Sequence, residues 1–244
     1  MQDIILFGMQ GSGKGTQARI LADKFGYKIF ETGGQLRRLA AEDSELGREV
    51  KEITTAGKLV SNEIVMKIVE NFLQNLTEGE QAIFDGIPRS ESQRVSLEAE
   101  FAKVSRKPLA VYISLNREEA LKRLLGRKTC SKCGKIFGTK DGSENLASCP
   151  ACGGELKIRA DDTQEAIETR LDVYDRETMP AIEKYREEGR LVEIEGTKGM
   201  ESVNAEIVSK LENGEIFKSF CGVTPFFLDV IDLCSSGAVS APLF

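Results

Sequence analysis

Residues near the start of the chain have types and spacing suited to binding phosphate. A short apolar run leads into residues 8–16, which read Gly-Met-Gln-Gly-Ser-Gly-Lys-Gly-Thr. Glycines let backbone amides approach phosphate oxygens, while Lys14 and the start of the next helix supply positive charge. A flexible turn would not need this set, because each glycine destabilises the fold through lost conformational entropy. We therefore predict a phosphate-binding loop whose ligand is held by Gly11, Ser12, Gly13, Lys14, Gly15 and Thr16.

Four cysteines have the spacing of a metal site. They form two Cys-x-x-Cys pairs, Cys130 with Cys133 and Cys149 with Cys152, and a glycine follows each pair. This is the pattern of a structural zinc site with four thiolate ligands, which has no open coordination position for catalysis. Disulfides are the alternative, and a cytoplasmic setting disfavours them. We expect Zn²⁺ to stabilise a segment that is too small to have a core of its own.

Composition excludes several classes of function. The chain has 244 residues, of which 41% are hydrophobic and 30% charged, as in soluble globular proteins. Its formal net charge of −6 argues against a nucleic-acid partner, and a zinc ribbon embedded in a phosphate-binding domain is better suited to a lid. No histidine is present, so imidazole cannot act as a general base. Phosphoryl transfer needs no such base, because it depends on positioning and electrostatics.

The sequence has no apolar stretch long enough to cross a membrane. Met1 leads into a strand rather than a signal peptide, so we expect a cytoplasmic protein with no membrane partner. We expect a monomer, with self-association through a C-terminal extension as the alternative. This extension, residues 213–244, is rich in aromatic residues and matches no known pattern. Packing of its apolar residues on the core is the interpretation we favour, with an effect on stability rather than chemistry.

Alternating strands and helices must position these residues. We expect strands at residues 3–8, 27–30, 81–85, 108–115 and 191–194. We expect helices at 14–25, 34–56 in two segments, 62–76, 91–103, 117–126 and 163–188, and a last helix after the strand at 191–194 that ends at about residue 211. Alternation of this kind predicts an α/β fold with a five-stranded parallel sheet in a three-layer sandwich. Ligands of such sheets bind at the carboxyl ends of the strands, where Gly8 and Asp85 fall.

Two segments interrupt this alternation and are interpreted as insertions. Residues 31–60 form a helical excursion, and residues 127–162 are poor in core-forming side chains. The predicted core domain is then made of residues 1–30, 61–126 and 163–212.

Five further segments occur in an order typical of one family. They are Glu31-Thr-Gly-Gly-Gln-Leu-Arg37, Gly57-Lys-Leu-Val60, Asp85-Gly-Ile-Pro-Arg89 with Gln93, Arg123-Leu-Leu-Gly-Arg127, and Arg159-Ala-Asp-Asp162 with Arg170. Each alone could be solvated surface. Together with the phosphate loop, they resemble the adenylate kinases of the long-lid, zinc-bearing type, from residue 1 to about 212. The resemblance implies a P-loop fold, with residues 31–60 as the helical NMP-binding insertion and residues 127–162 as a zinc-knuckle lid.

The resemblance also implies an activity: reversible phosphoryl transfer from MgATP to AMP to give two ADP. The implied ATP-binding residues are Gly11, Ser12, Gly13, Lys14, Gly15, Thr16, Arg123, Arg127, Ile136, Phe137 and Lys198. The implied AMP-binding residues are Thr32, Arg37, Lys58, Leu59, Val60, Gly86, Ile87, Pro88, Arg89, Gln93, Arg159 and Arg170. The implied catalytic residues are Lys14, Arg89, Arg123, Arg127, Arg159 and Arg170. Thr16 and Asp85 would orient water around Mg²⁺.

Arginine suits such a reaction, because its guanidinium is planar, always charged and able to bind phosphate through two hydrogen bonds. The insertions would close over the substrates, with Gly126 and residues 159–162 as hinges, and opening would limit turnover.

One position departs from the family pattern, since Gly34 stands where Asp is common. Two other functions stay open: a kinase for another nucleoside monophosphate, such as UMP or CMP, and a regulatory switch that binds ATP. The long lid and Thr32 favour AMP, since pyrimidine kinases of this family generally lack the lid and tend to have Ala at that position. No segment resembles the water-orienting part of a nucleotide switch.

Overall fold

A five-stranded parallel sheet forms the centre of the structure, a computed structural model that describes residues 2–138, 146–159 and 161–212. Its strands are β1 (Ile4–Phe7), β2 (Lys28–Glu31), β3 (Ala82–Asp85), β4 (Leu109–Ser114) and β8 (Leu191–Glu195), in the order β2-β3-β1-β4-β8. Neighbours in this order pair in parallel throughout. The predicted fold class is therefore confirmed. After β1 the chain adds β2 and β3 on one side of β1, and then β4 and β8 on the other side. The strand order therefore reverses at β1, and ligands of such sheets bind at this point.

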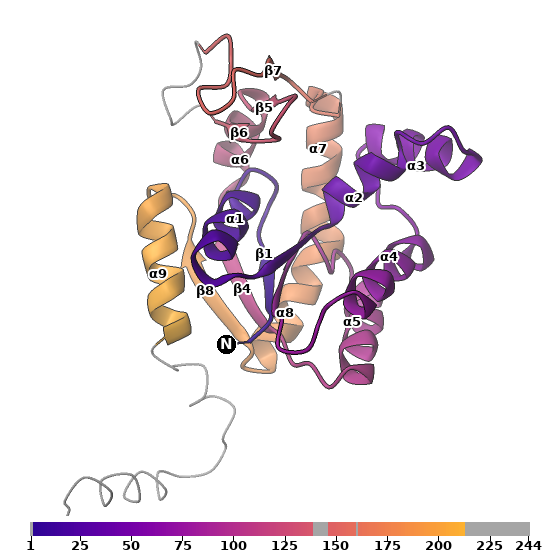
Figure 1. Cartoon of the computed structure of the whole chain (residues 1–244), viewed down its shortest axis with the longest axis vertical. Coiled ribbons are helices and arrows are strands. Elements are labelled where there is room, and N and C mark those ends of the chain that lie inside the picture. The colour runs from indigo at the N-terminus through magenta and orange to yellow at the C-terminus, as the bar shows by residue number, and fades with distance from the viewer. Residues whose placement is uncertain (1, 139–145, 160, 213–244) are drawn as a thin grey trace, which may run out of the picture.

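The sheet is covered by helices on both faces (Figure 1). Ile4 and Leu6 of β1 point to a core made with α1 (Lys14–Phe25) and α9 (Met200–Glu212), whereas Ile5 and Phe7 point to the opposite core. That opposite core contains side chains of α4 (Asn62–Gln74), α5 (Glu91–Lys103), α6 (Arg117–Leu125), α7 (Gln164–Val173) and α8 (Met179–Glu187). Burial on both faces explains why the central strands are continuous apolar runs.

The helix expected over residues 163–188 is not uniform. Between α7 and α8 the chain forms a π-helical turn, Tyr174–Thr178, without leaving the helical path. Turns of this kind are often found beside functional sites. Here the turn faces the candidate site, because the Thr178 hydroxyl donates a hydrogen bond to the carbonyl oxygen of Arg89 at 2.9 Å.

The two insertions lie at the edges of the sandwich (Figure 1). The first contains α2 (Thr32–Leu39) and α3 (Glu45–Thr55), so its first helix begins two residues before the expected position 34. The second contains a small antiparallel sheet, which the sequence did not indicate, of β5 (Lys128–Cys130), β6 (Ile136–Phe137) and β7 (Leu156–Lys157). The division of the chain into a core, an NMP-binding insertion and a lid stays a prediction.

Residues 213–244 lie outside the described residues, and so does the expectation that they pack on the core or mediate self-association. Among the residues that are described, no helix has the length and apolar character needed to cross a bilayer.

A buried ion pair joins the amino ends of three strands. The Asp3 carboxylate, in a residue only 6% exposed, accepts hydrogen bonds from the Ala82 amide at 2.8 Å and from Arg106 Nη1 at 2.8 and 3.0 Å. Arg106 also donates to the carbonyl oxygen of Glu80 at 2.9 Å. The pair therefore links the start of β1 to β3 and to the loop before β4.

We predict that Asp3→Asn lowers the free energy of unfolding by about 3 kcal/mol, because it leaves the Arg106 charge buried and unpaired. Asp43→Asn is the matched control, since Asp43 pairs with Arg48 at 3.1 Å in solvent and should contribute less than about 1 kcal/mol. Urea denaturation of both variants measures the difference. Equal effects would contradict a structural role for the buried pair.

Candidate active site

The predicted phosphate loop connects β1 to α1 in a conformation that requires glycine. Gly8 has a φ of +148°, and a Cβ there would lie 2.6 Å from the carbonyl oxygen of Ile113. Gly13, with a φ of 94°, precedes the first residue of α1 and lets the chain turn into the helix. The helix N-terminus therefore begins inside the loop, where its free amides and dipole favour an anion.

Lys14 is held by the loop itself. Its Nζ donates to the carbonyl oxygens of Gly8 at 2.6 Å and Met9 at 3.0 Å. The pKa of Lys14 is lowered to about 8, mainly by burial; Asp85 opposes this shift, while Arg89 and Arg127 contribute to it. A phosphate in place of the two carbonyl oxygens would restore the charge on this amine.

The loop lines the first of two cavities, with a volume of about 520 Å³. It lies at the carboxyl ends of β1 and β3, where sheets of this class bind ligands. Predicted site residues that line it are Gly11, Ser12, Gly13, Lys14, Gly15, Thr16, Arg37, Asp85, Gly86, Arg89, Arg123, Arg127, Ile136, Arg159 and Lys198. Most of the predicted ATP-binding residues are thus brought together.

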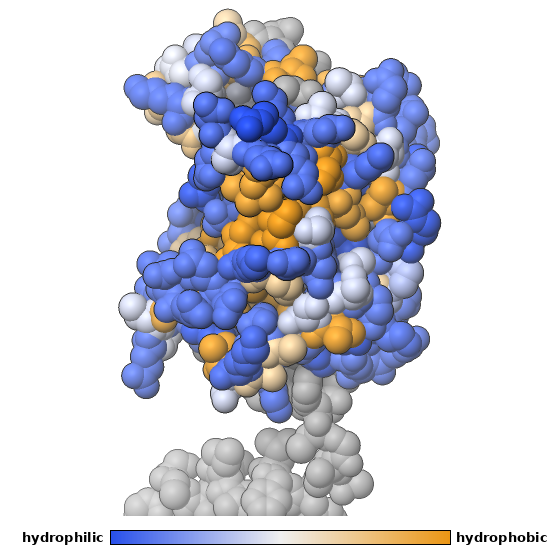
Figure 2. Space-filling view, turned by 90° about the vertical axis from the view of Figure 1, so that its right-hand side faces the viewer, coloured by the Kyte–Doolittle hydropathy of each residue, from blue (hydrophilic) through white to orange (hydrophobic). Residues whose placement is uncertain are grey.

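A second cavity, of about 110 Å³, lies on the side of the first insertion. Predicted site residues that line it are Thr32, Arg37, Lys58, Leu59, Val60, Arg89, Gln93, Arg159 and Arg170. Figure 2, which looks onto the side of α3 and α4, shows apolar side chains gathered in the middle of a more polar surface. Arg37, Arg89 and Arg159 line both cavities, so the two adjoin at a group of guanidinium ions.

Arg89 is fixed between the two cavities from several directions. Its Nε donates to the carbonyl oxygen of Gly86 at 2.8 Å, its amide donates to Gln93 Oε1 at 2.8 Å, and its carbonyl accepts from Thr178. Burial lowers the pKa of Arg89, Asp85 raises it, and the nearby Arg170 and Arg37 lower it again. Arginine stays charged under these conditions, so the environment favours an anionic ligand.

Two aspartates at the end of the second insertion bind an arginine at its start and an arginine of α7. The Asp162 carboxylate has no exposed surface and accepts from Arg127 Nε at 2.9 Å, Arg127 Nη2 at 2.7 Å and Arg170 Nη1 at 3.1 Å. Asp161 accepts from Arg170 Nη2 at 2.6 Å. Asp162 thus joins the first residue of the predicted lid to the helix after the lid. The sequence motif contained both aspartates, but only the structure assigns them these contacts.

Among the described residues, no carboxylate lies within hydrogen-bond distance of the Arg159 guanidinium. Its Nε donates instead to Thr129 Oγ1 at 3.1 Å. Burial, Arg127 and Arg37 together lower the pKa of Arg159 to about 10, against the attraction of Asp162 and Asp161.

Asp85 closes the first cavity at the end of β3. Burial raises its pKa, while Lys14 and Arg89 lower it. A Cβ at Gly15 would lie 3.2 Å from Asp85 Oδ2, so glycine lets the first turn of α1 approach the carboxylate. This contact gives a physical reason for the glycine between Lys14 and Thr16. Asp85 and Thr16 line the same cavity and supply oxygen atoms of the kind that Mg²⁺ and its bound waters prefer.

Four buried side-chain oxygens of residues that line the cavities lack a hydrogen-bond partner among the described residues. They are Gln10 Oε1, Ser12 Oγ, Thr32 Oγ1 and Tyr174 Oη. Buried polar atoms are usually paired, so unpaired ones in a cavity wall indicate a polar ligand. Gln10 was not among the predicted site residues, and only its position in the folded loop reveals it.

Several predicted site residues lie elsewhere. Phe137 does not line either cavity and packs with Cys130 and Cys149. Ile87 and Pro88 are also absent from both cavity walls. Their proposed nucleotide contacts stay predictions.

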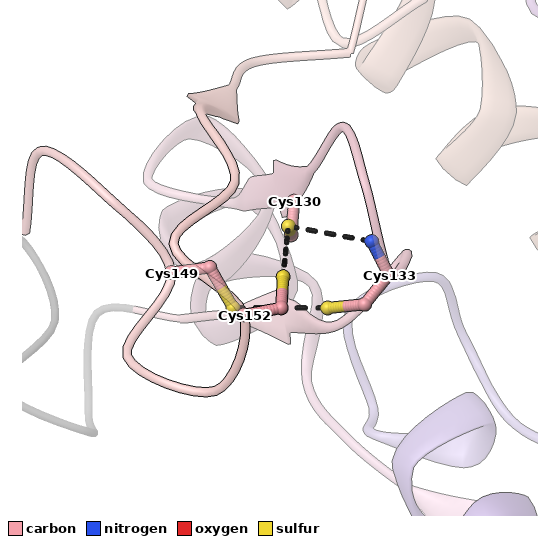
Figure 3. Close-up of side chains that lie close together, drawn as sticks. All are labelled: Cys130, Cys133, Cys149 and Cys152. Atoms are coloured by element: carbon pink, nitrogen blue, oxygen red, sulfur yellow. Dashed lines mark hydrogen bonds between the residues drawn. The ribbon is translucent and has the colours of Figure 1, made fainter.

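The four cysteines converge in the second insertion (Figure 3). All four sulfur atoms lie within 4.8 Å of one another, with Cys130 Sγ 3.5 Å from Cys152 Sγ and Cys133 Sγ 3.7 Å from Cys149 Sγ. These distances are too long for disulfides but close to the edge of about 3.8 Å in a tetrahedron with metal–sulfur bonds of about 2.3 Å. The Cys133 amide is the main group that lowers the pKa of Cys130, to about 6, which favours the thiolate.

Comparison with known proteins adds independent information. A family model described as adenylate kinase matches residues 6–190. The chain is 37% identical over 214 residues to an adenylate kinase of Archaeoglobus fulgidus, covering 86% of this chain and 98% of that protein. It is 40% identical over 206 residues to an adenylate kinase of Methanosarcina acetivorans, covering 82% and 94%. It is 37% identical over 213 residues to that of Paramagnetospirillum magneticum, covering 86% and 98%.

We predict that the Lys14 amine takes up a proton when ATP binds. With a pKa of about 8, the free amine is about half protonated at pH 8, and an adjacent phosphate shifts it toward the charged form. Calorimetry at pH 8 in two buffers of different ionisation enthalpy measures this uptake. Lys14→Arg is the control, because its guanidinium is already protonated, so its uptake should be lower by about half a proton. Equal uptake by both proteins would contradict a depressed pKa.

Proposed function

The chain belongs to the adenylate kinase family, and from this premise we propose how its residues carry out phosphoryl transfer between ATP and AMP. The reaction is reversible and gives two ADP. The observation that best supports the residue assignment is the meeting of the two cavities at Arg37, Arg89 and Arg159. A larger cavity with a phosphate loop suits the triphosphate donor, and a smaller one behind the arginines suits the monophosphate acceptor.

In the donor site, backbone amides from Gly11 to Thr16 bind the phosphates of ATP. Lys14 exchanges its bonds to the carbonyl oxygens of Gly8 and Met9 for the β- and γ-phosphates. Arg123 already lies against the loop, with Nη1 3.3 Å from the carbonyl oxygen of Gly11. Ile136 of β6 and Lys198 line the same cavity and complete the side toward the base.

In the acceptor site, Thr32, Gln93 and residues 58–60 surround AMP, while Arg37 and Arg89 bind its phosphate. The nucleophile is an oxygen of that phosphate, which is already an anion, so no general base is required. This agrees with a chain that has no histidine. Arg89, held between the cavities, contacts both the acceptor phosphate and the transferred group.

The remaining arginines stabilise charge that spreads over the transferred phosphoryl group. Arg127 and Arg170 are released from Asp162 as the polyanions arrive, and Arg159, which hydrogen-bonds no carboxylate among the described residues, gains an anionic partner. Electrostatic stabilisation of this kind, in a site closed to water, is usually the largest contribution to catalysis.

Two metal ions fit the residues present. Mg²⁺ would be held with ATP through water molecules oriented by Thr16 and Asp85, and it would neutralise charge on the donor phosphates. Zn²⁺ would be bound by Cys130, Cys133, Cys149 and Cys152, whose sulfurs stand at tetrahedral distances, and its role would be structural.

Closure of the two insertions would exclude water from the γ-phosphate. We assign residues 1–30, 61–126 and 163–212 to the core, residues 31–60 to the AMP side and residues 127–162 to the lid, with hinges at Gly126 and residues 159–162. The Asp162 contacts at both ends of the lid support this assignment. A cytoplasmic location, a monomer and the lack of nucleic-acid or membrane partners remain part of the proposal, supported by the thiolate cluster and the net charge of −6.

We predict that ATP consumption depends on AMP. Equimolar ATP and AMP with Mg²⁺ should form ADP as the only product until equilibrium is reached, whereas ATP without AMP should be hydrolysed slowly. Chromatography of the nucleotides measures both. Stimulation by UMP or CMP but not by AMP would overturn the acceptor assignment, and rapid hydrolysis without an acceptor would indicate a switch.

Arg89→Ala should lower kcat by about a hundredfold or more, because one preorganised donor to the transition state is removed. Arg176→Ala is the matched control, since the Arg176 side chain is 69% exposed and lines neither cavity. A loss of tenfold or less in Arg89→Ala would exclude Arg89 from catalysis.

Purified protein should contain one zinc ion per chain, measured by elemental analysis. Cys149→Ser should lower the melting temperature by about 5 °C or more. The bound metal stabilises this segment in the way a hydrophobic core would, and the variant loses that metal. Activity should persist at low temperature. Ser131→Ala, between the first two cysteines, should change neither property. Complete inactivation of a folded Cys149→Ser protein that retains zinc would contradict a structural role.

A further inference from the structure

Two successive glycines in the first turn of α2 make room for one ion pair. A Cβ at Gly33 would lie 3.0 Å from Arg37 Nη1 and 3.6 Å from Arg37 Nη2, so the guanidinium lies over Gly33. A Cβ at Gly34 would lie 3.4 Å from both Glu31 Cδ and Glu31 Oε2, so the carboxylate lies over Gly34. The two groups meet above this pair of glycines, with Arg37 Nη2 2.9 Å from Glu31 Oε1.

Glu31 stands at the edge of the proposed site. It ends β2, directly in register with Asp85 at the end of β3, and lines the larger cavity. Its second oxygen lies 3.8 Å from Arg19 Nη2. Arg37, its main partner, lines both cavities. Glu31 therefore reaches the acceptor site only through Arg37.

The charges around Arg37 explain why it needs a partner. The nearby Arg37 charge lowers the pKa values of Arg89 and Arg159, which means that these guanidinium ions repel one another. Asp161 and Asp162 make their hydrogen bonds to Arg127 and Arg170. Glu31 is the carboxylate that hydrogen-bonds Arg37 among the described residues. Asp161 also attracts Arg37 but makes its hydrogen bond to Arg170, so without Glu31 the flexible Arg37 side chain would be free to turn into solvent.

We propose that Glu31 is the positioning residue for Arg37 in the acceptor site, and that it supplies the carboxylate that residue 34 lacks. This inference rests on the proposed role of Arg37 in binding the phosphate of AMP. Glu31 uses Nη2, which leaves Nη1 and Nε of the guanidinium available to phosphate oxygens. A Cβ at position 34 would lie 3.4 Å from Glu31 Oε2, so a carboxylate added there would place two like charges in contact.

The ion pair should have little effect on folding. The side chains of Arg37 and Glu31 are 40% and 33% exposed, and pairs of this exposure stabilise proteins weakly. A change in binding can therefore be separated from a change in stability.

The first test is Glu31→Gln, which keeps the shape of the side chain and removes its charge. We expect KM for AMP to rise about tenfold, in line with the loss of a charge-assisted hydrogen bond that orients a phosphate ligand. We expect kcat and KM for ATP to change less than about twofold, and the melting temperature to stay within about 2 °C. Arg38→Ala, an exposed neighbour on α2, is the control and should leave KM for AMP unchanged.

The second test moves the carboxylate. Gly34→Asp alone should raise KM for AMP, because the introduced carboxylate and that of Glu31 repel each other. Glu31→Ser frees the space over residue 34 and keeps a residue suited to the N-cap of α2. In that background Gly34→Asp should bring KM for AMP back toward the wild-type value, whereas Gly34→Asn should not.

Three outcomes would overturn the proposal: an unchanged KM for AMP in Glu31→Gln, a lower KM, which would make Glu31 a competitor of the phosphate, or no recovery with Gly34→Asp. Failure of the proposed function would look different, because the wild-type protein itself would then form no ADP from AMP.

Discussion

Mutual repulsion among arginines that converge on two adjoining cavities is the constraint on which the rest of the structure depends. Burial and neighbouring guanidinium ions lower the pKa values of Arg89 and Arg159, so bringing them together without a ligand is unfavourable. The protein offsets this with carboxylates and carbonyl oxygens: Asp162 binds Arg127, and loop carbonyls bind Lys14. Each of these internal partners occupies donors that phosphate oxygens would otherwise use. The site is therefore arranged for polyanions before any arrives.

The elements of the fold serve this arrangement. The strand order reverses at β1, which puts the phosphate loop and Asp85 at the same edge of the sheet. The π-helical turn after α7 lets Thr178 hold the Arg89 backbone. Asp162, at the end of the second insertion, binds Arg127 at its start and Arg170 of α7, so arrival of phosphate at these arginines would be coupled to movement of the proposed lid. The cysteine cluster lies in the same insertion and would stabilise it by binding a metal ion.

Local patterns in the sequence were sufficient for the phosphate loop, the cysteine cluster and the alternation of strands and helices. Each depends on residue types at short spacing, as with residues 8–16 or the pair Cys130 and Cys133. Other features depend on contacts between distant residues and could not be predicted. The ion pair of Glu31 with Arg37 requires α2 to begin directly after β2. Phe137 packs with Cys130 and Cys149, which form a small core beside the small antiparallel sheet. The unpaired Gln10 oxygen is revealed only by the folded loop.

The most direct test of transfer between adjoining cavities is the stereochemical course at phosphorus. ATP made chiral at its γ-phosphorus by isotopic labelling would be incubated with AMP and Mg²⁺, and the configuration of the phosphoryl group in the new ADP determined. A single in-line displacement, with attacking and leaving oxygens on opposite sides of phosphorus, predicts inversion. Retention would require two successive transfers through a phosphorylated side chain and would contradict direct transfer across Arg89.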